Sequence, residues 1–321
     1  MPSTSQRPSL EGILLVDKPV EWTSHDVVAK LRSVLRMRRI GHTGTLDPFA
    51  TGLLVVCLNR STRLVQFLTG HEKEYLATLR LGWQTETGDW TGEPVTIPTA
   101  STMISQCAIE SVLPSLRGRI WQTPPMYSAR KLGGRKLYEL AREGKVVERQ
   151  AVEVEIRELT LGGITVDEGE ADGPPTLRVE FRVVCSAGTY IRTLAEEIGT
   201  RLGVGAHLTA LRRIRVGCCR IDTAHSLGQI ADLARQDRAH EILLSPVEVL
   251  GFPTVRVTPR ETSAILHGQS ITVSGPLPGS WQDGERLSIC DDGERLLSVA
   301  VFDATTGRIV PRVVLGDSSG D

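Results

Sequence analysis

The segment RRIGHTGTLDPFATGLLVV, residues 38–56, limits the possible folds more than any other part of the chain. From residue 52 to 58 the sequence is continuously apolar apart from its first glycine, which predicts a buried central strand. Before it stand two glycines and the step Asp47-Pro48, which predict a rigid turn that lets other backbone approach closely. Asp before Pro is also common in purely structural turns. The pattern therefore predicts a carboxylate fixed in a cleft beside a strand, without assigning its chemistry.

Three other apolar patterns predict strands. Residues 12–17 form a short apolar run that ends at a Lys-Pro step, and residues 177–185 form a second run. Residues 73–81 alternate between apolar and mixed positions, as expected for a half-buried strand. In this alternation Tyr75 falls on the apolar side, so its ring is predicted to face the interior.

Apolar residues at helical spacing follow three of these predicted strands. Thr23 and the aspartate three residues later resemble a capping box, and apolar residues then recur up to residue 35 with one buried face. A short helix is predicted at about 62–68. A third helix is predicted after the Ser-Ala-Gly turn at 186–188, where apolar spacing continues to residue 202 and Arg192 lies in the first turn.

Residues 84–125 differ from this regular pattern because they hold turns and proline-rich stretches. The sequence PPMYSARKLGGRKLYELAREGK follows, with a Pro-Pro entry, a Gly-Gly break and an amphipathic end. We expect this part, about residues 100–150, to be an excursion from the core sheet.

The pattern of residues changes again near residue 250. Short alternating runs separated by Gly, Pro and Asp predict an all-β module of about seventy residues. We therefore expect one domain at 1–249 and a second at 250–321. The second carries six basic and nine acidic side chains, whereas the whole chain has a net charge of −1. Capture of a polyanion should therefore depend on the first domain.

Basic residues gather in three places in that domain. Residues 29–40 hold five and no acid, basic residues outnumber acidic ones at 130–149, and four arginines lie between residues 212 and 220. A single run of charge is usually a solvated helix face. Three clusters, each beside a glycine-rich or aromatic motif, favour a surface that binds a polyanion.

The composition favours a protein of the cytoplasm. Charged residues make up 23% of the chain and hydrophobic residues 40%, and no apolar run is long enough to span a bilayer. The polar start MPSTSQRPSL lacks the apolar centre of an export signal. The six cysteines show no CxxC spacing, which favours buried reduced thiols over disulfides or zinc ligands.

Several common kinds of site are disfavoured. The glycines do not match a dinucleotide fingerprint or a phosphate loop, and no nucleophile elbow occurs. The seven histidines are scattered without the spacing of metal ligands. We expect no metal and no cofactor.

Five segments follow one another from about residue 11 to 225: LLVDKPVEWTS, GHTGTLDPFATGLLVV, KEYLATLRLG, QTPPMYSARKLGGRKLYELAREG and CSAGTYIRTLAEEIGTRLGVGAHLTALRR. In these segments, and in their order, the chain resembles the TruB family of tRNA pseudouridine synthases. The resemblance implies an α+β fold with a mixed, largely antiparallel central sheet flanked by helices. The C-terminal module more weakly resembles a PUA RNA-binding domain. The segment YSARKLGGRKLYELAREG is similar to that of the stand-alone bacterial enzymes.

The resemblance implies that the enzyme isomerises uridine to pseudouridine at position 55, in the T loop of tRNA. It makes Asp47 the nucleophile or the base, with Arg192 as the cation that keeps its carboxylate ionised. Tyr75 would stack on the target base and assist proton transfer at C5, although an aromatic residue on the apolar side of a strand fits equally well as core.

Further residues match positions of the family that contact RNA. His42 resembles the residue that fills the space left by the extruded base. Tyr190 and Leu211 match pocket-lining positions, and Leu211 is equally typical of a core. Arg63, Lys131 and Arg142 are predicted to contact RNA, the last two from the excursion that would grip phosphates.

The chain departs from the family at two positions. Glu21 stands where the family usually has glycine, which raises a question about the local turn and adds a negative charge. Arg63 stands where lysine is usual, and a guanidinium differs from an ammonium in geometry. We expect tRNA, through its T arm, as the only partner: no guide RNA, no membrane and no obligate protein, and a monomeric enzyme.

Two other functions fit parts of the sequence. An RNA-binding or RNA-folding factor would use the same surface without turnover, but it would not need Asp47, Tyr75 and Arg192 together. A glycoside hydrolase would need a second carboxylate near Asp47, and only Glu72 and Glu74 come close in sequence. We rank the hydrolase far below the other two.

Overall fold

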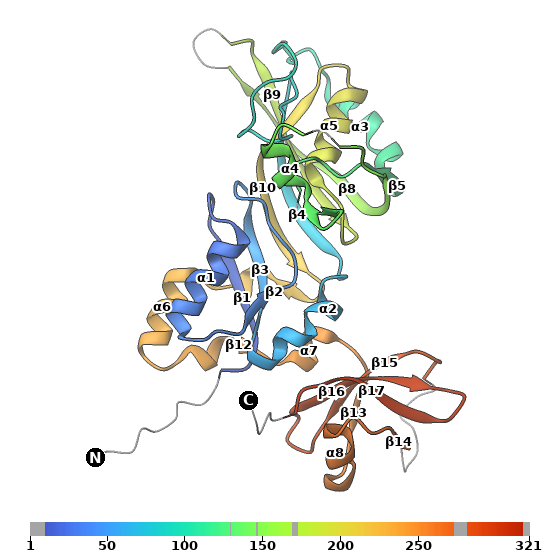
Figure 1. Cartoon of the computed structure of the whole chain (residues 1–321). Coiled ribbons are helices and arrows are strands. Elements are labelled where there is room, and N and C mark those ends of the chain that lie inside the picture. Colours follow the sequence, from blue (N-terminus) through green and yellow to red (C-terminus); the bar gives the residue numbers. More distant parts are fainter. Residues whose placement is uncertain (1–9, 129, 146, 169–172, 273–280, 317–321) are drawn as a thin grey trace.

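One large sheet organises most of the chain (Figure 1). The computed structural model describes residues 10–128, 130–145, 147–168, 173–272 and 281–316. Within them the strand order is β12-β1-β3-β10-β4-β9-β8-β5, with β2 beside β3 and β11 beside β10. The strands are β1 (Gly12–Lys18), β2 (Ile40–His42), β3 (Thr51–Leu58), β4 (Lys73–Leu81), β5 (Gly118–Gln122), β8 (Val152–Asp167), β9 (Thr176–Cys185), β10 (Ala206–Val216), β11 (Cys219–Arg220) and β12 (Leu243–Leu244).

Neighbouring strands in this sheet run antiparallel, except that β10 pairs with β3 in parallel. This confirms the largely antiparallel sheet that the family resemblance implied. The three apolar runs and the alternation at 73–81 are all strands, and the predicted bounds agree to within one residue. In β4 the side chain of Tyr75 is 8% exposed and that of Leu76 is 47% exposed, as the alternation predicts.

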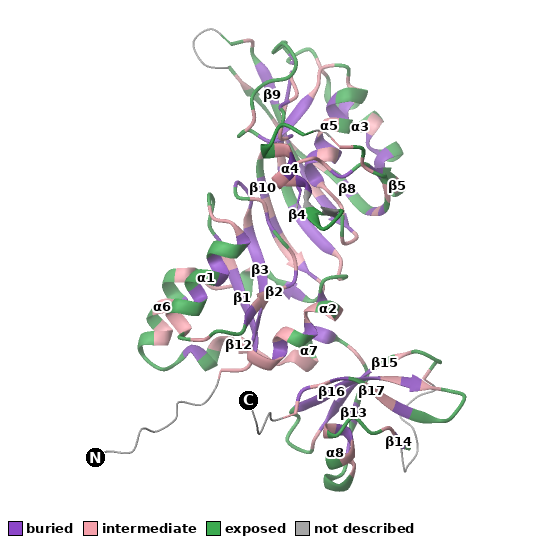
Figure 2. Cartoon of the chain, in the orientation of Figure 1, coloured by how far each residue is buried: buried purple, intermediate pink, exposed green. Residues whose placement is uncertain are grey.

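Helices cover the sheet in two places and enclose separate cores (Figure 2). The helix α1 (Ser24–Leu35) packs on β1 and β3, and α5 (Ile191–Arg201) packs on β4, β9 and β10. The capping box of Thr23 and Asp26 is present at the start of α1. The predicted helix at 62–68 begins earlier, as the 3-10 helix η1 (Asn59–Leu64), and continues as α2 (Val65–Leu68). Close to the sheet lie also α6 (Leu227–Arg235), η3 (Ile221–Thr223), η4 (Ala239–Ile242) and α7 (Pro246–Leu250).

The region from 84 to 150 leaves the sheet and returns to it. It holds α3 (Gln106–Val112), η2 (Pro114–Leu116) and the edge strand β5. A small hairpin of β6 (Lys131–Leu132) and β7 (Arg135–Lys136) follows, and then α4 (Leu137–Arg142). An excursion was expected here, but β5 is part of the large sheet and ties this region to β8.

The C-terminal region forms a second sheet of its own, in the order β13-β15-β16-β17-β14. Its strands are β13 (Thr254–Arg256), β14 (Ile271–Thr272), β15 (Arg286–Cys290), β16 (Leu296–Asp303) and β17 (Arg308–Val314). It also holds one helix, α8 (Pro259–Leu266), which an all-β module would lack. This helix spans about two turns, too short for its apolar period to stand out, and the Thr258 capping box starts it. The first strand of this sheet begins a few residues after the predicted boundary at 250.

Candidate active site

Asp47 lies in the loop that joins β2 to β3, and backbone contacts on both sides hold this loop in place. On one side, the buried hydroxyl of Ser24 accepts a hydrogen bond from Leu46 N at 2.9 Å and donates to Leu46 O at 3.3 Å. On the other, Pro48 O accepts from Glu21 N at 2.8 Å and from Lys18 Nζ at 3.2 Å. The residues before and after Asp47 are therefore anchored to the start of α1 and the end of β1.

Arg192 faces Asp47 and binds both oxygens of its carboxylate. Arg192 Nε lies 2.9 Å from Asp47 Oδ2, and Arg192 Nη2 donates to Asp47 Oδ1 at 3.1 Å. The guanidinium also donates to Thr87 O at 2.8 Å and to Tyr127 O at 2.7 Å. Its side chain is only 4% exposed, whereas that of Asp47 is 32% exposed. This two-point contact fixes the carboxylate in one orientation while leaving part of it open.

Burial and charge act in opposite directions on Asp47. Burial is the largest influence and raises the pKa of its carboxyl above the ordinary value, and the nearby carboxylate of Asp89 adds to this rise. The guanidinium of Arg192 and the ammonium of Lys18 oppose it. The arrangement is that of a carboxylate whose charge depends on its cationic neighbours.

Lys18 is a buried cation next to this loop. Its side chain is 0% exposed, and Nζ donates to Pro19 O at 2.8 Å and to Trp22 O at 2.5 Å besides Pro48 O. Burial lowers the pKa of Lys18 to about 8, and the charge of Asp47 acts against this shift. Lys18 therefore supports the loop through carbonyl groups and also contributes positive charge to the site.

Glu21, where the resemblance led us to expect glycine, lies in a turn with a left-handed backbone conformation. Its φ of 67° lies in the left-handed region, which glycine adopts without strain. From this conformation its backbone N–H reaches Pro48 O, next to Asp47. The substitution therefore leaves the local turn intact, and the structure shows why glycine suits the position.

Tyr75 and Leu211 lie beside the Asp47 loop. Both are buried in one cluster with Leu46 and Phe49, which flank Asp47 closely in sequence. Burial raises the pKa of the Tyr75 hydroxyl, against the influence of Arg213. Arg213 pairs with Tyr75 across β10 and β4 and donates to Gly44 O at 3.0 Å in the Asp47 loop.

His42 and Tyr190 stand at the edges of this group. His42 ends β2, and its buried Nδ1 has no hydrogen-bond partner among the described residues. Burial is the main cause that lowers the pKa of His42, so the imidazole is neutral near pH 7. Tyr190 is the residue before α5 and is half-buried. The amide of Gln122 holds its backbone, accepting from Tyr190 N at 3.0 Å and donating to Tyr190 O at 3.3 Å.

The other three predicted RNA contacts lie outside this group. Arg63 lies in η1 and donates to Val314 O in the second sheet, so it faces the junction between the two sheets rather than Asp47. Arg142 is exposed at the end of α4, with its guanidinium 5.4 Å from the ring centre of Tyr138. Lys131 begins β6, and its side chain lies outside the part of the structure that is described. For all three, RNA contact stays a prediction.

Four residues of the site were not identified from the sequence: Lys18, Asp89, Gln122 and Arg213. Asp89 is 4% exposed and lies 3.8 Å from Arg192, held by Thr87 Oγ1 at 2.9 Å and Thr91 N at 3.0 Å. The sequence around it, TETGDWTG, predicts a turn but no functional role. Nothing in the sequence pattern connects these residues to Asp47, because strands distant in sequence bring them together.

The described residues contain no group of three or more His, Cys, Asp or Glu side chains that could hold a metal ion. In the same residues no helix is long and apolar enough to cross a membrane.

This fold and site define a class of RNA-modifying enzyme. Residues 32–191 match the sequence profile described as TruB family pseudouridylate synthase (N terminal domain), and residues 192–250 match that of the tRNA pseudouridylate synthase B C-terminal domain. The chain belongs to the TruB family of pseudouridine synthases.

Two curated relatives in bacteria are named tRNA pseudouridine synthase B. The chain is 42% identical to that of Burkholderia lata over 305 residues, which covers 93% of this chain and 90% of the relative. It is also 42% identical to that of Mycobacterium sp. strain KMS over 299 residues, which covers 92% and 97%.

Solved structures with the same fold extend over nearly the whole chain. The crystal structure of a Cbf5-Nop10-Gar1 complex matches with a TM-score of 0.70 and 25% identity, over 96% of this chain and 85% of that one. An H/ACA RNP bound to a substrate RNA containing 2′-deoxyuridine also has a TM-score of 0.70, at 23% identity, over 97% and 86%. The second likeness concerns the fold alone.

Proposed function

We propose that the chain isomerises the uridine at position 55, in the T loop of tRNA, with Asp47 as the nucleophile or base. Isomerisation of uridine to pseudouridine is the reaction of the family to which the chain belongs, and the relatives at 42% identity bear the name of the tRNA enzyme. The observation that carries the assignment to Asp47 is its two-point contact with Arg192, at 2.9 and 3.1 Å, in a loop anchored on both sides.

The reaction breaks the bond between ribose C1′ and uracil N1, turns the base, and joins C1′ to C5. The hydrogen of C5 leaves, and N1 gains a proton, so the balance requires no oxidant or cofactor. Asp47 needs its charge to act as nucleophile or base, and Arg192 and Lys18 favour that charge. Tyr75 and Leu211 supply the buried surface against which the extruded base would lie.

The remaining roles are proposed from the resemblance to the family. His42, neutral and with an unpartnered ring nitrogen, fills the space that the uracil leaves in the T loop. Tyr190 lines the entrance beside Arg192. The excursion at about residues 100–150 binds RNA phosphates through Lys131 and Arg142. Arg63 contacts RNA near the junction of the two sheets.

For the whole molecule, we propose a catalytic domain at 1–249 and a PUA-like RNA-binding domain at 250–321. The enzyme works as a monomer in the cytoplasm and needs no guide RNA and no protein partner. The bacterial relatives at 42% identity are named tRNA pseudouridine synthase B, which supports this over an assembly of the kind named in the Cbf5 structure.

The test is release of tritium from a tRNA transcript labelled at C5 of uridine, with the purified chain alone. We expect release by the parent, none from a transcript with cytidine at position 55, and a loss of at least a thousandfold in Asp47→Asn. Release by Asp47→Asn at the parent rate would remove Asp47 from the chemistry. Binding of tRNA without release by either protein would favour the RNA-folding factor instead.

A further inference from the structure

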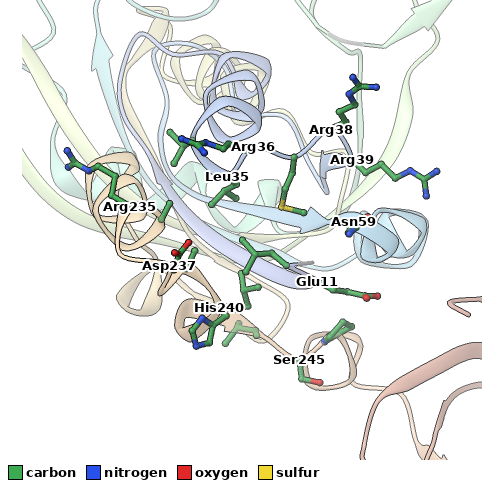
Figure 3. A pocket seen from close by; sticks show the side chains of 18 residues that line it. Glu11, Leu35, Arg36, Arg38, Arg39, Asn59, Arg235, Asp237, His240 and Ser245 are labelled. Atoms are coloured by element: carbon green, nitrogen blue, oxygen red, sulfur yellow. The ribbon is translucent and has the colours of Figure 1, made fainter. Parts of the chain in front are cut away.

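A hollow of about 1280 Å³ lies at the other end of β3 from Asp47 (Figure 3). It opens between the end of α1, the start of β1 and the stretch from α6 to β12. Its lining includes partly buried apolar side chains such as Leu35 and Leu243. Since a strand rises about 3.3 Å per residue, the eight residues of β3 place this hollow about 25 Å from Asp47.

Three arginines at one edge of the hollow have no acidic partner. Arg36, Arg38 and Arg39, which we call the arginine rim, are exposed, and within the described residues no ion pair or hydrogen bond involves their guanidinium groups. Elsewhere arginines are mostly neutralised. On β10, for example, Arg215 binds Glu72 and Glu74, each at 2.7 Å. The arginine rim is therefore a local excess of positive charge in a chain of net charge −1.

Two acidic residues line the hollow, Glu11 and Asp237. Glu11 is bound by Arg60, with Arg60 Nε donating to Glu11 Oε2 at 2.7 Å. Within the described residues, no ion pair joins either acid to the arginine rim. Arg235 of α6 also lines the hollow, but its side chain is 77% exposed and pairs with Asp232 on the same helix. The unbalanced charge thus lies in the turn from α1 to β2.

The directions of these side chains indicate the size of the ligand. Figure 3 shows the ends of Arg38 and Arg39 pointing away from the middle of the hollow, with Arg36 set apart from them along the turn from α1 to β2. A small buried anion needs donors that converge on one point. Exposed guanidinium groups spread along an edge match an extended polyanion, whose phosphates are spaced along a backbone.

The chain connects this edge directly to the candidate active site. From Arg39 it runs through β2 to His42, and then along β3, where Thr43 N donates to Val55 O at 3.1 Å, until it reaches Asp47. One continuous segment thus carries the arginine rim at one end and Asp47 at the other. An RNA that is held at Asp47 by its T loop and extends along this segment would reach the arginine rim.

We propose that the arginine rim binds phosphates of the tRNA that lie outside the T arm. This inference rests on the proposed function, because it assumes a tRNA whose T loop is held at Asp47. The rim then adds affinity for whole tRNA over the isolated T arm, and it does so at about 25 Å from the reacting uridine.

The experiment measures binding of whole tRNA and of a T-arm hairpin to Arg36→Gln/Arg38→Gln/Arg39→Gln over a range of salt. We expect whole tRNA to bind about tenfold more weakly at low salt. The slope of log affinity against log salt should become shallower by about two, at roughly 0.7 to 0.9 for each phosphate that the protein no longer neutralises. Hairpin binding should change by less than about twofold. The double variant Arg38→Gln/Arg39→Gln, which leaves the C-cap of α1 unchanged, should show part of the same loss.

The matched control is Arg178→Gln/Arg201→Gln/Arg238→Gln, which removes the same charge from arginines that are each paired with an acid and lie outside the proposed RNA-binding domain. An equal loss in this control, an equal loss for the hairpin, or an unchanged salt slope would overturn the proposal. So would binding of inorganic pyrophosphate that the rim variant abolishes while its tRNA affinity is unchanged.

Performing the binding in the Asp47→Asn background separates the two hypotheses. Tritium release by Asp47→Asn would refute the catalytic assignment, and the binding results would still decide the role of the arginine rim.

Discussion

At Asp47, burial and the neighbouring charges act in opposite directions on one carboxyl. Burial raises its pKa, and Arg192 and Lys18 hold the rise in check. Lys18 is itself a buried cation, and its pKa falls to about 8. Because backbone carbonyls hold both cations, and Arg192 also binds Asp47, the charge of the site is set before any RNA binds.

Replacing Arg192 by lysine should move the acidic limb of the activity profile to higher pH. Since Asp47 is proposed to act in its ionised form, we expect activity above its pKa and a loss of activity as the pH falls through it. A lysine cannot make the two-point contact, so the pKa of Asp47 should rise further. We expect the acidic limb of kcat/KM to shift to higher pH, with kcat reduced about tenfold or more.

The control for this experiment is Arg201→Lys, on the same helix, whose partner is the exposed Glu197. Its pH profile should match the parent. A limb that stays in place or moves to lower pH in Arg192→Lys would contradict the role given to Arg192.

Among the elements, β5 and the residues after it connect the excursion to the start of α5. Gln122, at the end of β5, is 4% exposed and holds both backbone polar groups of Tyr190. Five residues further on, Tyr127 O accepts from Arg192. The helix α5 has no side-chain cap of its own at this end. Residues 122–127 therefore position the helix that carries Arg192.

Gln122→Leu should consequently impair turnover more than binding. Loss of both hydrogen bonds frees Tyr190 and loosens Arg192, so we expect kcat to fall about tenfold or more with KM changed less than threefold. The acidic limb should shift upward as in Arg192→Lys. Gln122→Glu, which keeps the acceptor and loses the donor, should fall between parent and Gln122→Leu.

The comparison variant is Gln106→Leu, on exposed α3, where the amide binds only Glu110. Its kinetics should be those of the parent. If Gln122→Leu lowered the melting temperature without shifting the acidic limb of the kcat/KM profile, the role of Gln122 would be structural only.

In the whole molecule, a small apolar contact joins the two sheets. Phe67 of α2 meets Phe252 edge-on at 6.1 Å between ring centres, and Arg286 lies over both rings at 5.4 and 6.0 Å. Arg63 adds a hydrogen bond to Val314 O. Buried residues of β1 and β3 continue into β15, β16 and β17 as one cluster, so the two regions share a core.

Phe67→Ala should loosen this junction. It removes the ring contact and the cation over it, and we expect the free energy of unfolding to fall by about 1–2 kcal/mol. Limited proteolysis in the stretch 251–258 should become faster. Trp121→Ala, which removes a ring that is 71% exposed, should have no such effect. Unchanged cleavage in Phe67→Ala would show that other contacts hold the junction.

The sequence alone determined the local elements, because their signals are local. The spacing around α1, the alternation of β4 and the apolar run of β3 each depend on a few neighbouring residues. The resemblance added the sheet and named Asp47, Arg192, Tyr75 and Leu211, which the structure brings together.

Only the tertiary structure decided what surrounds Asp47 and what does not. Lys18, Asp89 and Gln122 reach the site through contacts with Pro48, Arg192 and Tyr190, which are distant from them in sequence. Arg63, by contrast, contacts the second sheet. The helix α8 could not be predicted from the sequence, because two helical turns are too short to show a periodic apolar pattern. The pairing of charges, and with it the unpaired arginine rim, depends on distances between residues far apart in the chain, and those distances are fixed only when the sheet has formed.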